Sequence, residues 1–98
     1  MIYSVSAQLY EEVADRLLEA IADKCYFSGS IECESEEGVL CRLVTSCVVY
    51  RQPLKMPEGE GSAIRSVIPV WWEFHTESKA GRLDNDFSFR DLHLENLL

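Results

Sequence analysis

The chain has 98 residues, 47% of them hydrophobic and 27% charged, a balance that fits one globular domain over residues 1–98 and disfavours global disorder. The formal net charge of −8 argues against direct nucleic-acid binding, because neutralising phosphates needs clustered Lys and Arg side chains. No export signal opens the chain, and no apolar run approaches the ~18 residues of a membrane span. We therefore expect a soluble, cytoplasmic protein without membrane contact.

The first predicted elements are a short strand over residues 2–5 and a long helix over residues 7–24. Ser6 is a suitable N-cap for that helix. At 100° per residue, apolar side chains fill one half of the helical wheel and acidic side chains fill much of the other half. The pattern predicts a helix that packs on a sheet through one side.

A β-hairpin is predicted over residues 26–50, with a three-residue loop in which Gly38 is left-handed. The resulting register places Glu34 opposite Leu40 and Cys33 opposite Cys41. It also gives the hairpin one apolar face, which we expect to lie against the helix. That face carries Phe27, Ile31, Cys33, Cys41, Leu43, Cys47 and Val49.

Two neighbouring tryptophans mark the next strand, predicted over residues 63–77 after a Pro- and Gly-containing loop over 52–62. Consecutive strand residues point to opposite faces, so Trp71 and Trp72 together predict that both faces of the sheet are covered. With Trp72 on the helix-covered face, Trp71 lies on the outer face. A β-bulge at Pro69 would exchange the faces on either side of it.

Residues 78–85 are polar and are predicted to form a loop, and a short C-terminal helix is predicted from about Phe89 to Leu97. The fold class is therefore α+β, with an antiparallel sheet of three to four strands and the long helix on one face. The C-terminal segment, residues 87–98, is free to cover the other face of its own sheet or to reach another subunit.

Apolar side chains also gather on the outer face in this prediction. The members that define a candidate interface are Val44, Val48, Tyr50, Val67 and Trp71. An exposed apolar patch rich in aromatic residues is typical of protein interfaces. We therefore predict a small, non-catalytic binding or assembly protein whose partner is a second copy, forming a homodimer, or another protein.

A row of carboxylates on the helix suggests an alternative role. Glu11, Asp15, Glu19 and Asp23 repeat at four-residue spacing, which costs a few tenths of a kcal/mol for each like-charge pair. Such an acidic ridge could imitate a row of phosphates and inhibit a basic, nucleic-acid-binding protein. The more common role of such a row is a solvated face that keeps the chain soluble.

An enzyme that uses Cys or His chemistry has the least support. The four cysteines form no C-x2-C motif, and Cys41 and Cys47 on one strand would lie ~20 Å apart. They cannot converge on one metal ion, and only Cys33 and Cys41 can meet, so we expect buried, reduced thiols. His75 is predicted on the face opposite the cysteines, and His93 lies in the tail. No metal or cofactor site is predicted.

Overall fold

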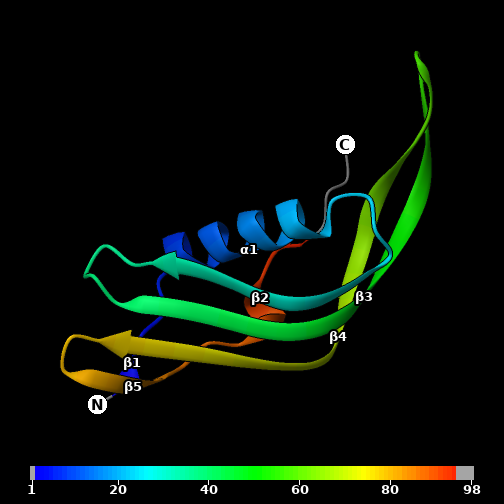
Figure 1. The fold of residues 1–98 in the computed structure, drawn as a ribbon. Coiled ribbons are helices and arrows are strands. Elements are labelled where there is room, and N and C mark those ends of the chain that lie inside the picture. The colour runs from blue at the N-terminus through cyan, green and yellow to red at the C-terminus, as the bar shows by residue number, and fades with distance from the viewer. Residues whose placement is uncertain (1, 95–98) are drawn as a thin grey trace.

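The computed structural model describes residues 2–94, and Figure 1 shows a sheet with one long helix along one of its faces. The strand order is β1-β5-β4-β3-β2, and all neighbours are antiparallel except β1 and β5. The α+β class is confirmed, but the sheet has five strands rather than three or four. The elements are β1 (Ile2–Tyr3), α1 (Ala7–Ile21), β2 (Tyr26–Glu34), β3 (Leu40–Met56), β4 (Gly59–Ser78), β5 (Gly81–Asn85) and the 3-10 turn η1 (Phe89–Asp91).

Helix α1 begins as predicted and ends earlier than predicted. The Ser6 hydroxyl accepts a hydrogen bond from the Leu9 amide at 3.1 Å, which caps the first turn. The helix stops at Ile21 because Ala22 has a φ of 51°, outside the right-handed helical region. The Arg51 guanidinium then donates to the Ala22 carbonyl at 2.6 Å, which ties this end of the helix to β3.

The buried side of α1 packs on the hairpin face that the sequence predicted. Its buried residues are Leu9, Val13, Ala14, Leu17 and Ile21. On the sheet, Cys33, Cys41 and Leu43 belong to the same core cluster. The apolar stripe of the helix and the alternation of the strands therefore meet in one core.

The predicted hairpin register is confirmed in full. Glu34 pairs with Leu40, Cys33 with Cys41, and Phe27 with Cys47. Gly38 has a φ of 79°, and the Ser35 amide donates to the Val39 carbonyl at 2.9 Å. Turn chemistry fixes the register here because only a left-handed residue closes this loop without strain.

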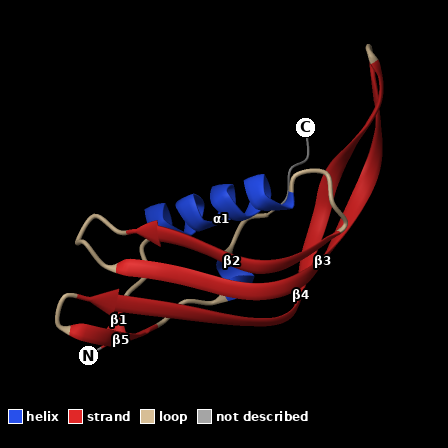
Figure 2. Ribbon diagram, in the orientation of Figure 1, coloured by secondary structure: helices blue, strands red, loops and turns tan. Residues whose placement is uncertain are grey.

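The predicted loop over residues 52–62 is wrong. These residues, called the arm below, continue β3 and β4 as a two-stranded ribbon, with Gln52 opposite Ala63 and Lys55 opposite Glu60. Figures 1 and 2 show the arm projecting beyond the body and bending toward the side on which α1 lies. The radius of gyration, 15.0 Å, accordingly exceeds the ~13 Å of a compact chain of this size. Proline is tolerated at position 53 because both strands of the ribbon are edge strands.

A β-bulge interrupts β4 beside Pro69. Ser46 pairs with Trp71 and Cys47 with Pro69, so Val70 is the extra residue. The bulge exchanges the faces of residues 66–69, as the sequence allowed, and a second register shift beside Arg65 returns Ile64 to the core face. Trp72 stays on the helix-covered face and Trp71 on the outer face, but two neighbours change sides. Val67, opposite the buried Val49, packs on the core, whereas Ile68 is 52% exposed on the outer face.

The segment after β4 was predicted as a loop and instead supplies the fifth strand. Ser78 pairs with Gly81 through a tight turn, and β5 then pairs in parallel with β1, Ile2 opposite Asp84. Strand β1 has two residues, rather than four, because the Val5 amide already donates to the Asp86 carboxylate at 2.8 Å.

The C-terminal segment lies on the same face as α1. A single 3-10 turn replaces the predicted helix within the described residues, and residues 95–98 of that prediction lie outside them. Phe87, Phe89, Leu92 and Leu94 are all buried in the main core. The Ser88 amide also donates to the Tyr10 hydroxyl of α1 at 3.0 Å. Residues 87–94 therefore do not cover the outer face of the sheet.

Candidate functional site

The candidate site is the outer face of the sheet, opposite α1. Helix α1 and residues 87–94 pack on the other face, and the arm bends away toward that same side. Nothing in the described part of the chain therefore covers the outer face. Its two halves differ in chemistry, one being apolar and the other charged.

The apolar half, called the outer patch, lies where β3 and β4 leave the body. Tyr26, Val48 and Ile68 form one row of direct cross-strand neighbours, and Trp71 stands opposite Ser46 in the next row. Tyr26, Tyr50, Ile68 and Trp71 are between 46% and 54% exposed, whereas Val44 and Val48 are partly buried. The outer patch consists of Tyr26, Val44, Val48, Tyr50, Ile68 and Trp71.

Four of the five residues of the predicted interface lie in the outer patch, and Val67 does not. Its placement was wrong because the bulge at Val70 turns it toward the core. Tyr26 and Ile68 were missed. Tyr26 could have been found by extending the hairpin register one step to Val48, whereas Ile68 follows only from the position of the bulge.

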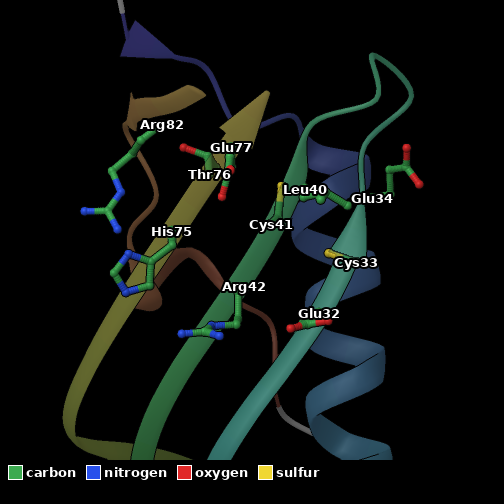
Figure 3. A pocket seen from close by; sticks show the side chains of 10 residues that line it. All are labelled: Glu32, Cys33, Glu34, Leu40, Cys41, Arg42, His75, Thr76, Glu77 and Arg82. Atoms are coloured by element: carbon green, nitrogen blue, oxygen red, sulfur yellow. The ribbon is translucent and has the colours of Figure 1, made fainter. Parts of the chain in front are cut away.

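The charged half, called the charged groove, lies at the other end of the face and is shown in Figure 3. It is a hollow of about 480 Å³. Cys33, Cys41 and Thr76 contribute to its floor, while their buried side chains belong to the opposite face. Its charged or ionisable side chains are Glu32, Glu34, Arg42, His75, Glu77 and Arg82.

The charges alternate from strand to strand. Strands β2 and β4 contribute carboxylates, and strands β3 and β5 contribute guanidinium groups. Arg42 stands opposite Glu32, and Arg82 opposite Glu77, yet neither pair comes within ion-pair distance. The groove thus holds guanidinium and carboxylate groups that are free to meet another surface.

One side-chain hydrogen bond borders the groove. The His75 Nε2 atom lies 3.1 Å from the Glu73 carboxylate, two residues along the same face of β4. Both side chains are substantially exposed, so this contact orients the imidazole but contributes little to stability.

No protein-family model, no curated protein and no solved structure matches this chain.

The role of the outer face therefore has to be inferred from its own geometry. In the described residues, no helix is long and apolar enough to cross a membrane. Among the same residues, no group of three or more His, Cys, Asp or Glu side chains is arranged to hold a metal ion.

The cysteines are free thiols, and three of the four are buried. A hydrogen bond with Cys33 and burial both raise the pKa of Cys41, and that thiol contact lowers the pKa of Cys33. Burial raises the pKa of Cys47. His75 projects from the opposite face of the sheet, so the structure does not bring the His75 imidazole and a buried thiol together as a nucleophile and its base.

The predicted acidic ridge is shorter than expected. Glu11, Asp15 and Glu19 are exposed along α1, but Asp23 lies beyond the helix end at Ile21 and leaves the ridge. His93 was not assigned a position from sequence, and it lines a shallow hollow beside α1 together with Glu11 and Asp15. These groups lie on the helix side of the molecule, away from the outer patch and the charged groove.

Proposed function

We propose that this chain is a non-catalytic binding protein that forms a homodimer through the outer face of its sheet. The observation that carries the proposal is the position of residues 87–94. These residues were the best candidates to cover the outer patch, and they pack on the opposite face. Tyr26, Tyr50 and Trp71 are consequently left about half exposed on one surface.

Burial of this exposed aromatic area favours association. A buried aromatic side chain covers about 200 Å², so the exposed halves of three such rings amount to about 300 Å². At ~25 cal/mol per Å², their burial would contribute about 7 kcal/mol before the entropic cost of association. Scattered apolar residues on a monomer need no explanation, but an aromatic cluster of this kind is typical of an interface.

Sedimentation equilibrium on the whole chain tests the proposal. We expect a species of twice the 11.2 kDa chain mass at micromolar concentration. Trp71→Ser should weaken self-association by at least about 30-fold, because a central aromatic residue typically contributes 2 kcal/mol or more. Ile2→Ser is the matched control, since Ile2 is 65% exposed but lies on β1, away from the patch. An 11.2 kDa species at every concentration of the unmodified chain would overturn the proposal.

A second candidate function is inhibition of a basic protein through the acidic ridge. The carboxylates of Glu11, Asp15 and Glu19 are exposed, and the ion pair found on this helix uses Glu12 and Arg16 instead. If the ridge imitates phosphates, the chain should compete with duplex DNA for polylysine at physiological salt. Reversal of all three carboxylates to Lys should abolish that competition, and unchanged competition would rule this role out.

A further inference from the structure

The outer patch alone is too small to hold two copies together. Along β3 it extends from Val44 to Tyr50, about 20 Å at ~3.3 Å per residue, and it is about 10 Å wide across three strands. Its footprint is therefore on the order of 200–300 Å², whereas a stable interface buries about 800 Å² per partner. A dimer formed through this face must include neighbouring surface.

The charged groove is the neighbouring surface that faces the same way. The arm also adjoins the outer patch, but it bends toward the side of α1 and so away from a copy placed against the outer face (Figure 1). The charged groove, by contrast, continues the outer face of β2, β3 and β4 without interruption. An interface larger than the outer patch therefore includes the charged side chains of the groove.

Symmetry restricts how two such faces can meet. A two-fold axis across the strands would lay the charged groove of one copy on the apolar patch of the other and bury unpaired charges, which is costly. An axis along the strands instead lays each cross-strand row on the same row of the second copy, reversed in direction. Apolar rows then meet apolar rows, and charged rows meet charged rows.

The position of that axis follows from the charges. Centred on β3, it would place Arg42 against its own copy. Centred between β3 and β4, it places β2 against β5 of the second copy and β3 against β4. In the end row, Glu34 of one copy then faces Arg82 of the other, and Leu40 faces Glu77. In the next row Arg42 faces His75, and in the apolar half Val48 faces Ile68.

We propose that the charged groove is the polar half of the homodimer interface, with Glu34 of each copy paired with Arg82 of the other. This inference rests on the proposed function, because it requires that the outer face meets a second copy. It explains why Arg82 makes no ion pair with any described residue although Glu77 stands opposite it on β4.

A charge swap tests the pairing directly. Glu34→Arg places two guanidinium groups together at each of the two equivalent contacts, and Arg82→Glu places two carboxylates together. Each variant alone should self-associate at least about tenfold more weakly than the unmodified chain. An equimolar mixture of the two should restore association to within about threefold, because both contacts again join opposite charges.

Glu19→Arg and Arg90→Glu are the matched controls, since both residues are exposed and lie on α1 and η1. They change the net charge by the same amounts and should leave the association unchanged. Far-UV circular dichroism verifies that each variant is folded. Single variants that dimerise like the unmodified chain, or a mixture no tighter than its components, would overturn the pairing.

The results separate the two proposals. If Trp71→Ser dissociates the dimer while both charge variants associate normally, the homodimer stands and the Glu34–Arg82 pairing falls. If the unmodified chain is monomeric, the homodimer and the Glu34–Arg82 pairing are both overturned.

Discussion

The ring of Phe87 stacks on the ring of Phe74, with centroids 3.9 Å apart and planes 9° from parallel. This contact joins the C-terminal segment to the second half of β4 on the face covered by α1. Phe87 also stacks on Tyr10 of the helix and meets Trp72 edge-on. One aromatic side chain thus links helix, sheet and tail, and its position is the reason that the outer face is left open.

Substitution of Phe87 by Ala should destabilise the chain by about 3–5 kcal/mol, because the buried ring leaves a cavity among three aromatic partners. Urea unfolding followed by circular dichroism measures the change. Tyr26→Ala is the control, since Tyr26 is 52% exposed on the outer face and should cost less than about 1 kcal/mol in the monomer. A loss below 1 kcal/mol for Phe87→Ala would mean that the tail is not docked in this way.

The arm should be dispensable for the fold of the body. No side chain described within residues 52–62 is buried, and a two-stranded ribbon without a core is marginal in water. Replacing residues 53–62 by Asn-Gly joins the partners Gln52 and Ala63 through a two-residue turn. We expect the free energy of unfolding to change by less than about 1 kcal/mol.

The same shortened chain also bears on the interface. Because the arm bends away from the outer face, sedimentation should give an unchanged dimer. A monomeric shortened chain that remains folded would show that the arm, and not the charged groove, completes the interface.

Stability should fall at alkaline pH through the buried thiol of Cys47. Burial raises the pKa of Cys47 in the folded chain above its usual value of 9.0. The folded state then resists ionisation that the unfolded state undergoes, so this stability is complete below pH 9 and is lost as the pH rises toward the folded pKa.

Urea unfolding at pH 7.5–10.5 in the presence of a reductant measures this slope, which for one thiol is at most ~1.4 kcal/mol per pH unit. Cys47→Ala should flatten the slope, although it lowers stability at every pH by removing a buried group. Cys25→Ala, at an exposed position, should leave the slope as it is. An identical slope for Cys47→Ala would contradict the assignment.

Local chemistry explains which parts of the fold were predictable. The hairpin register follows from Gly38, and the buried side of α1 follows from its apolar spacing, because both are decided within a few residues. The arm was missed because its Pro and Gly content is typical of a loop, and a ribbon that packs on nothing has no hydrophobic period to reveal it. Strand β5 was missed for the same reason, being short and polar.

The candidate site was predictable in part, and its limits have a physical cause. Pro69 indicated a bulge, but the sequence does not show which neighbour of Pro69 is the extra residue. That position decides which of Val67 and Ile68 faces the core and which faces outward. The charged groove was not predicted, because it depends on β5 pairing beside β4 and so bringing Arg82 near residues of β2 and β3. The C-terminal segment packs on the α1 side through the Phe87–Phe74 contact, and no local sequence pattern predicts a contact between these two residues.

Thr45 should hold the bulge of β4 in place. Its side chain is fully buried, and its hydroxyl donates to the Trp71 carbonyl at 2.7 Å, beside the extra residue Val70. A bulge locally disrupts the ladder, so this side chain satisfies a backbone acceptor at the point of disruption.

Thr45→Val keeps the shape of the side chain but removes the donor. We expect a loss of about 1–3 kcal/mol in the free energy of unfolding, because the Trp71 carbonyl loses a partly buried hydrogen bond. The variant should also weaken self-association, since Trp71 is presented to the outer face by this stretch of backbone. Val44→Thr, on the half-buried outer side of the same strand, is the control and should cost less in stability. If Thr45→Val unfolds at the urea concentration of the unmodified chain, the hydroxyl does not support the bulge, and the position of Trp71 must be set by the strand pairing alone.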